Sequence, residues 1–129
     1  MITERTSKMT SLEGNALNFS AAIQLCGGKE DLAREIIQML VDELPKQNLL
    51  LQTAFEQHDW KQLDYLTHKL SGSAAYCGME QIKKYSHIVN KTIREKDLPQ
   101  VIIQLPLLQQ AITSALAAAA ALDIKPTGE

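Results

Sequence analysis

The sequence predicts an all-α protein, an up-and-down antiparallel four-helix bundle with a short extra helix at its N-terminal end. Apolar residues recur at spacings of three or four through most of the chain, which is the period of an amphipathic helix. The four prolines and six glycines fall mainly at the expected ends of helices. No strand-like alternation of apolar and polar residues is found. Because the connections between the long helices are short, successive helices are expected to run antiparallel.

The first two expected helices occupy about residues 19–26 and 29–57. Asn18 is the predicted N-cap of the first, since an asparagine side chain can accept a hydrogen bond from the first turn of a helix. Pro45 lies inside the second helix and predicts a kink or a short break, because proline removes a backbone donor and clashes with the preceding turn. The apolar positions expected to face inward in the second helix are Leu32, Ile36, Met39 or Leu40, Leu44, Leu51 and Phe55.

Three further helices complete the predicted bundle. Asp59 is the N-cap of the next helix, which is expected to end at Gly78, a residue type favoured just after a helix. Another helix covers about residues 79–96, and the last begins near residue 97 with Pro99 in its first turn. The positions expected to face inward in the first two of these are Leu63, Leu66, Leu70 and Ala74, followed by Met79, Ile82, Ser86, Val89 and Ile93.

The length of the chain predicts one domain. The 129 residues are enough for one hydrophobic core and too few for two ordinary ones. We expect a flexible N-terminal segment over residues 1–14, the bundle over residues 15–122, and a flexible tail over residues 123–129.

Composition excludes several classes of function. A net charge of −2 without a basic run argues against nucleic-acid binding, which usually requires a basic patch. Cys26 and Cys77 are too few for a disulfide framework, so a reducing cytoplasm is expected. The N-terminus lacks an apolar signal core, and polar residues interrupt the apolar stretch 101–122, so neither a membrane span nor direct membrane contact is expected. We expect a cytoplasmic monomer.

His68 is the strongest candidate for a functional residue. The positions three, four and seven residues after it share its side of the helix, and these are Ser71, Gly72 and Ala75, all small. A glycine inside a helix costs about 1 kcal/mol relative to alanine. We therefore infer that something must approach the backbone closely, as when a nucleophile on a cleared surface enters the active site of another protein.

The next helix is expected to bring cationic groups beside this histidine. Antiparallel helices rise equally, so the position opposite His68 lies near His87. Lys84, His87, Lys91 and Arg94 share an outer stripe of that helix, and Asn90 adds an amide. Such groups could orient the imidazole and offset the charge of a phosphoryl group. The stripe is equally well interpreted as an ordinary exposed, lysine-bearing surface.

An imidazole suits covalent phosphoryl transfer, because the group in general has a pKa of about 6.5 and is largely neutral at neutral pH. The transfer also needs in-line positioning and charge neutralisation, usually with a metal ion. The sequence contains no Walker-type glycine loop, no kinase signature and no carboxylate cluster suited to magnesium. We expect no cofactor in this chain, and the catalytic machinery must then come from a partner.

The stretch His68-Lys69-Leu70-Ser71-Gly72-Ser73-Ala74 resembles the signature of histidine-containing phosphotransfer (HPt) domains of two-component phosphorelays. The resemblance covers about residues 15–120, and four flanking segments carry it further. These segments are Leu25 to Leu32 at the first turn, Glu43-Leu44-Pro45 in the kinked helix, Asp59-Trp60 with Leu63 at the start of the active helix, and Cys77-Gly78-Met79 at its end.

The resemblance implies that His68 is the phosphoacceptor, with Lys69 and Gly72 as matching members of the motif. The phosphoryl group would arrive from an aspartate of one receiver domain and leave to an aspartate of another, and the receiver would supply Mg²⁺. Ser71 departs from the pattern, because the family commonly has a lysine there. Asn90 best matches the family residue that hydrogen-bonds the active imidazole, with His87 as the alternative.

Other interpretations stay open at this point. The main one is a non-catalytic helical protein-interaction bundle. A metal-binding bundle would have to use His58, His68 and His87, none of which lies in a Glu-x-x-His pair, and a Cys–His hydrolase would have to pair Cys77 with a histidine. The sequence is similar both to the C-terminal HPt domains of hybrid sensor kinases and to freestanding HPt proteins. It does not identify the partner receivers, the direction of phosphate flow or the input signal.

Overall fold

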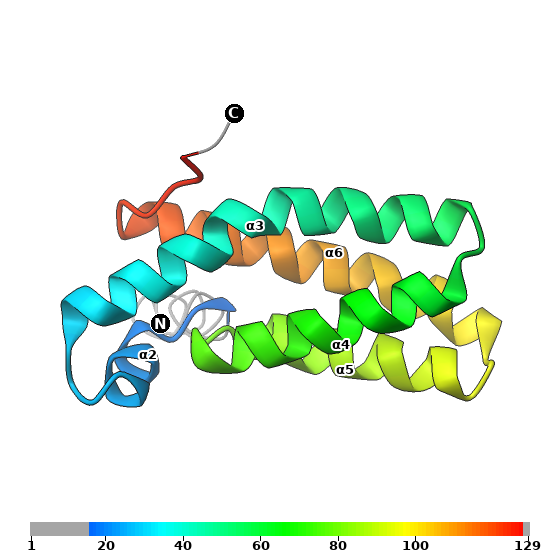
Figure 1. The fold of residues 1–129 in the computed structure, drawn as a ribbon, viewed down its shortest axis with the longest axis horizontal. Coiled ribbons are helices and arrows are strands. Elements are labelled where there is room, and N and C mark those ends of the chain that lie inside the picture. The colour runs from blue at the N-terminus through cyan, green and yellow to red at the C-terminus, as the bar shows by residue number, and fades with distance from the viewer. Residues whose placement is uncertain (1–15, 128–129) are drawn as a thin grey trace, which may run out of the picture.

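The computed structural model describes residues 16–127. Within this part the chain is all helical, and four long antiparallel helices form a bundle with the short α2 at one end (Figure 1). The helices are α2 (Phe19–Leu25), α3 (Glu30–Glu56), α4 (Trp60–Tyr76), α5 (Glu80–Arg94) and α6 (Leu98–Ala121). The predicted fold class is confirmed.

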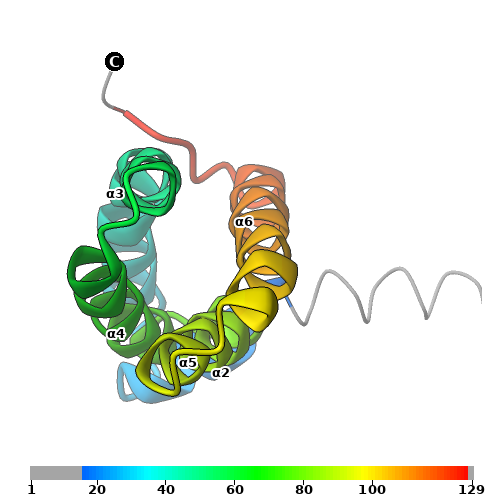
Figure 2. The ribbon, with the colours of Figure 1, turned by 90° about the vertical axis from the view of Figure 1, so that its right-hand side faces the viewer.

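One aliphatic core lies between the four long helices. The view along the bundle shows α3, α4, α5 and α6 in order around it (Figure 2). The predicted inward positions of α4 and α5 are all buried. The α4–α5 and α5–α6 pairs pack closely along their lengths, whereas α3 and α6 meet over a smaller surface. The side of the bundle between α3 and α6 is therefore the least tightly closed.

Polar side chains begin three of the helices, as predicted for Asn18 and Asp59. The Oδ1 atoms of Asn18, Asp59 and Asp97 accept hydrogen bonds from backbone N–H groups in the first turns of α2, α4 and α6, at 3.0, 3.1 and 3.3 Å. These bonds satisfy N–H groups that have no partner inside the helix. The starting points of these helices are therefore set by local sequence.

The end of α4 requires a glycine. Gly78 has a φ of +69°, a backbone conformation that glycine adopts without steric cost. A Cβ at this position would also collide with the backbone oxygen of Asn18. The Asn18 N–H donates to the Gly78 carbonyl at 2.8 Å, so the start of α2 is joined directly to the end of α4.

Two expectations for α3 have different outcomes, since a kink was one of the two alternatives expected at Pro45 and only the position of Leu32 needs correction. The helix continues through Pro45 without a break, although its axis changes direction along its course (Figure 1), as expected where proline removes a hydrogen bond. Leu32, predicted to face inward, is 39% exposed. It lies in the first turn of α3, where the helix extends beyond the end of α4 and has little to pack against.

The segment after α6 also differs from expectation. Residues 123–129 were predicted to form a flexible tail, but the part up to residue 127 lies against α3. Ile124 is buried in the core. Arg34 donates to the Leu122 carbonyl at 2.9 Å and Gln38 donates to the Lys125 carbonyl at 2.6 Å. The last two residues and the predicted flexible segment 1–14 lie outside the described residues.

Helix α6 is the one helix in the described residues that is long and apolar enough, by length and composition alone, to cross a membrane. An 18-residue window of this 24-residue helix reaches a mean hydropathy of 1.5. Val101, Leu108 and Ile112 on this helix are fully buried in the bundle. A core helix of a bundle can pass the same test, and 33% of the apolar window of α6 is buried inside the bundle, so one such helix is weak evidence of a membrane span.

Candidate functional site

His68 lies on the outer surface of α4. Leu66 and Leu70, two residues before and after it, are buried in the core, while His68 itself is exposed. Side chains two positions apart on a helix point about 200° apart, so the burial of these leucines turns the imidazole toward solvent. A second protein can therefore reach His68.

The surface beside His68 is open. Gly72, one turn further along α4, is exposed, and a Cβ built on it would meet no other atom of the chain within 4 Å. Ala75 is half-buried and adds only a methyl group. No contact within the described structure therefore requires a glycine at position 72, although glycine weakens the helix. The remaining physical reason for a glycine here is contact with another molecule.

The other two motif residues lie on either side of His68. Lys69 is exposed. It is the residue after His68, and it lies on the side of α4 that faces α3. Ser71 is half-buried on the side of α4 that faces α5. Because position 71 is a serine, the side of α4 that faces α5 lacks the lysine that is common at this position in the family.

Asn90 of α5 contacts the turn of α4 that immediately precedes His68. Its Nδ2 group donates to the Asp64 carboxylate oxygen Oδ1 at 2.6 Å, to the Asp64 carbonyl at 3.0 Å and to the Thr67 hydroxyl at 3.1 Å. Asn90 was the predicted hydrogen-bond partner of the imidazole, with His87 as the alternative. In the structure its amide instead binds Asp64 and Thr67, in the turn of α4 just before His68.

Arg94 reaches the same carboxylate. Its Nε atom lies 3.4 Å from Oδ1 of Asp64, so this cation is paired with α4 and is not free beside His68. Asp64 and Thr67 did not stand out in the sequence. The signal that could have identified Asp64 is its position four residues before His68, on the same side of a helix.

The hydrogen bonds of Asn90 also define which residues of α4 and α5 lie level with each other. Asn90 is opposite Asp64 and Thr67, and the helices are antiparallel with equal rise. His87, about one turn earlier on α5, therefore lies approximately level with His68, as predicted from sequence, and both histidines are exposed. Lys84 is turned away, since its ammonium group lies 5.3 Å from the centre of the Tyr85 ring.

A mostly apolar cleft of about 370 Å³ lies between α3 and α4. From α3 it is lined by Ile36, Met39, Leu40 and Glu43, and from α4 by Ser73, Tyr76 and Cys77. Met39 and Tyr76 are 68% and 70% exposed. His68, Gly72 and Tyr76 are spaced four residues apart, so they form one row on the surface of α4. The cleft therefore continues directly from the open surface beside His68.

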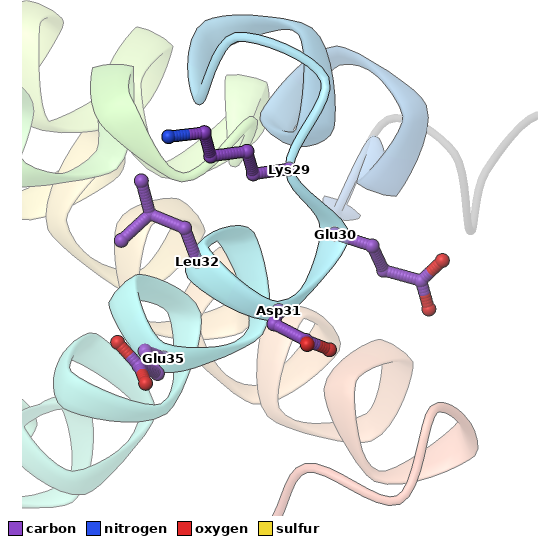
Figure 3. Close-up of a pocket in the computed structure, with 5 residues that line it drawn as sticks. All are labelled: Lys29, Glu30, Asp31, Leu32 and Glu35. Atoms are coloured by element: carbon purple, nitrogen blue, oxygen red, sulfur yellow. The ribbon is translucent and has the colours of Figure 1, made fainter.

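A larger and more open hollow lies elsewhere, at the start of α3. It is lined by Lys29, Glu30, Asp31, Leu32 and Glu35, and Figure 3 shows their charged ends pointing in different directions. These groups do not converge on a common point. Within residues 16–127 no cluster of three or more histidine, cysteine or acidic side chains could hold a metal ion. Neither this hollow nor a metal centre competes with the His68 surface.

The described structure also argues against a Cys–His nucleophile pair. Cys77 is buried, and its Sγ lies 3.8 Å from the Ile36 carbonyl. Burial, with a smaller contribution from nearby Cys26, raises the pKa of the Cys77 thiol to about 11. A thiol with a raised pKa stays protonated at neutral pH and is a poor nucleophile.

An exposed histidine beside a helical glycine, on the outer face of an antiparallel four-helix bundle, is the arrangement of a histidine phosphotransfer module. Residues 35–121 match the family model described as the Hpt domain. The chain belongs to this family. Its function is histidine phosphotransfer in a phosphorelay of the two-component type.

Similar proteins agree with this assignment. The chain is 28% identical over 109 residues to the signal transduction histidine-protein kinase BarA of Shigella flexneri and of Escherichia coli K12. It is 27% identical over 96 residues to the sensor histidine kinase GacS of Pseudomonas protegens. The matches to BarA cover 81% of this chain and 12% of that protein, and those to GacS cover 73% and 10%. The chain therefore spans about a tenth of the length of these relatives.

A solved structure shows the same fold. The HPT domain of a sensor hybrid histidine kinase from Shewanella superposes with a TM-score of 0.68. It is 25% identical in sequence, and the match covers 83% of this chain and 96% of that one.

Proposed function

We propose that His68 is the phosphoacceptor and that receiver domains are the partners on both sides of the transfer. The unprotonated ring nitrogen of a neutral His68 attacks the phosphorus of an aspartyl phosphate on one receiver. The bond between phosphorus and the aspartyl oxygen breaks, and the carboxylate leaves with its electron pair. The reverse reaction with an aspartate of a second receiver returns the imidazole to its starting state.

The single observation that carries this proposal is the open surface around His68. Gly72 has no packing reason within the described chain, and His68 is exposed beside it. HPt domains act together with receiver domains, and a receiver loop that carries an aspartyl phosphate needs such clearance to reach an imidazole on a helix. We expect the receiver to hold the Mg²⁺ that neutralises the transferring phosphoryl group, and this chain to need no cofactor.

The docking surface that we propose extends from His68 along α4 to the cleft between α3 and α4. Met39 and Tyr76 are large, exposed apolar side chains at that cleft, and Glu43 lies at its edge. An apolar centre with a polar rim is typical of protein–protein interfaces. Because transfer between receivers takes place in the cytoplasm, we place this domain there, as a monomer that binds one receiver at a time.

The direct test is His68→Gln. We expect this variant to lose acid-labile phosphorylation by a phosphorylated receiver domain, while its melting temperature stays within about 2 °C of the wild type because the side chain is exposed. Phosphorylation is measured by radiolabel transfer and by mass spectrometry under alkaline conditions. His87→Gln is the matched control, an exposed histidine at the same level on α5, and it should keep the label.

The alternative is a non-catalytic interaction bundle. A wild-type chain that takes no label from any phosphorylated receiver, yet binds a receiver in its unphosphorylated form, would favour that alternative. Label that persists in His68→Gln and disappears in His87→Gln would move the acceptor to α5.

A further inference from the structure

We propose that Asn90 and Arg94 are positioning residues that restrain the Asp64 carboxylate against α5. They keep its negative charge away from the phosphoryl group on His68. The inference rests on the proposed role of His68 as phosphoacceptor and adds a residue, Asp64, that the phosphotransfer motif does not contain.

Asp64 is placed where its charge matters. It lies four residues before His68, so the two side chains are neighbours on one side of α4. On the same side, Ser71 and Ala75 carry no charge, and position 71 lacks the lysine that the family pattern leads one to expect. A carboxylate free to turn toward His68 would repel the phosphoryl group, and no cation on this side of α4 would offset that repulsion.

The restraint on Asp64 comes from two side chains of α5. The Asn90 amide donates to Oδ1 of Asp64 at 2.6 Å, and the guanidinium of Arg94 lies 3.4 Å from the same atom. The Asp64 side chain is 33% exposed and that of Arg94 is 61% exposed. An exposed ion pair alone contributes little. The short, charge-assisted bond from the half-buried Asn90 is therefore the stronger restraint, and Arg94 supplies the neutralising charge.

Asn90 also fixes the backbone beneath His68. In a helix the Asp64 carbonyl accepts the N–H of His68, and this same carbonyl accepts from Asn90 at 3.0 Å. Thr67, the fully buried residue before His68, accepts from Asn90 at 3.1 Å and donates to the Leu63 carbonyl at 2.9 Å. One amide thus holds both the carboxylate and the helical turn that carries the imidazole.

The size of the expected effect follows from Coulomb's law. A unit charge about 6 Å from the reacting phosphorus, in a medium between water and a protein surface, changes a rate by roughly three- to tenfold. Salt screens this effect, because the Debye length falls from about 10 Å at 0.1 M to about 3 Å at 1 M. If Asn90 or Arg94 only stabilised the fold, its substitution would produce neither this size of rate change nor this dependence on salt.

The test uses phosphoramidate as a small phosphoryl donor, so that docking of a receiver plays no part. The neutral ring nitrogen of His68 attacks phosphorus, the P–N bond breaks and ammonia leaves. We expect Arg94→Gln and Asn90→Ala to slow phosphorylation of His68 roughly three- to tenfold at low salt, and much less at 1 M salt. Lys46→Gln removes one positive charge from the exposed surface of α3, away from His68, and should leave the rate unchanged.

The decisive measurement is rescue by a second substitution. Asp64→Asn, added to Arg94→Gln, should restore the rate to within twofold of Asp64→Asn alone, because Arg94 contacts only the carboxylate of Asp64 and the charge that it restrains is gone. Circular dichroism melting of each variant establishes that it is folded at the assay temperature. A rate that stays low after Asp64→Asn would overturn the proposal, as would unchanged rates in both single variants.

These outcomes are distinct from failure of the proposed function. If phosphoramidate labels the wild type at a residue other than His68, as located by mass spectrometry, then the assignment of the acceptor is wrong. If the label is on His68 but Asp64→Asn brings no rescue, then His68 remains the acceptor and only the role of Asn90 and Arg94 is refuted.

Discussion

At the scale of single residues, the proposed roles of His68 and Gly72 are complementary. His68 is exposed although it lies between two buried leucines. Gly72 is exposed in the middle of a 17-residue helix, where no neighbouring atom excludes a side chain. Gly72 therefore lowers the stability of the helix, and no packing contact within the described residues compensates for that loss. That imbalance is expected where a residue is retained for binding.

Substitution of Gly72 separates stability from function. Gly72→Ala should raise the free energy of unfolding by about 0.5–1 kcal/mol, because alanine is the better helix former and has open space here. Gly72→Leu should also remain folded, but it should slow phosphotransfer from a receiver at least tenfold by filling the surface beside His68. Urea denaturation and receiver transfer rates measure the two effects.

Phosphoramidate provides the control for Gly72, because this small donor should still label His68 in Gly72→Leu. Unchanged transfer from a receiver to Gly72→Leu would contradict a role in clearance.

At the scale of secondary-structure elements, the two neighbours of α4 have different tasks. Helix α5 binds the turn of α4 below His68 through Asn90 and Arg94. Helix α3 contributes the apolar side chains of the cleft. On another side, α3 is bound by the segment after α6, through Arg34, Gln38 and Asp42. The helix that forms one wall of the docking cleft is thus supported by the C-terminal segment.

Ionisation of Asp42 controls the last of these contacts. Its Oδ1 atom accepts from the Thr127 N–H at 2.8 Å and from the Thr127 hydroxyl at 3.0 Å. The bond from the Thr127 N–H, aided by Gln38, lowers the pKa of Asp42 below the usual range of an aspartate. A carboxyl group whose pKa is lowered by folding stabilises the folded state above its unfolded pKa, and this contribution is lost as the pH falls through the lowered value.

We therefore expect Thr127 to be held at neutral pH and released only as the pH falls through the lowered pKa of Asp42, below the ordinary range of an aspartate. Asp42→Ala should release it already at neutral pH, which faster amide hydrogen exchange at Thr127 would show at a fixed pH. Glu35→Ala, which removes an exposed carboxylate from the same helix, should leave that exchange unchanged. Equal exchange rates in Asp42→Ala and the wild type would exclude the contact in solution.

At the scale of the whole molecule, the described residues form a bundle that carries the proposed nucleophile and the proposed docking surface on its outside. The core is aliphatic and fully buried, and the site lies on the outside of it. Binding of receivers can therefore be altered without loss of the fold. Met39 and Leu49, two exposed apolar side chains of α3, provide a matched pair for this test.

Met39 and Leu49 are both 68% exposed on α3, but only Met39 lines the cleft next to α4. We expect Met39→Ala to weaken binding of a receiver domain about three- to tenfold, the loss typical of an apolar contact at an interface, with a nearly unchanged melting temperature. Leu49→Ala should change neither property. Isothermal titration calorimetry measures the affinity, and equal affinities of the two variants would remove the cleft from the docking surface.

Much of the fold followed from local rules. The caps at Asn18, Asp59 and Asp97 and the glycine at position 78 set helix ends through interactions within a few residues. The inward stripes of α4 and α5 followed from helical period alone. The stripe of α3 was less well predicted, because Leu32 continues the period at a place where the neighbouring helix has ended.

The sequence by itself determined the helical fold, its core and the candidate nucleophile, because hydrophobic period, capping and the spacing of small residues after His68 are local properties of the chain. Only the tertiary structure decided which partners the polar side chains take. Asn90 binds Asp64 and Thr67, Arg94 pairs with Asp64, and residues 123–127 lie against α3. Such contacts depend on the relative rotation and level of packed helices, and a shift of one residue turns a side chain by 100°.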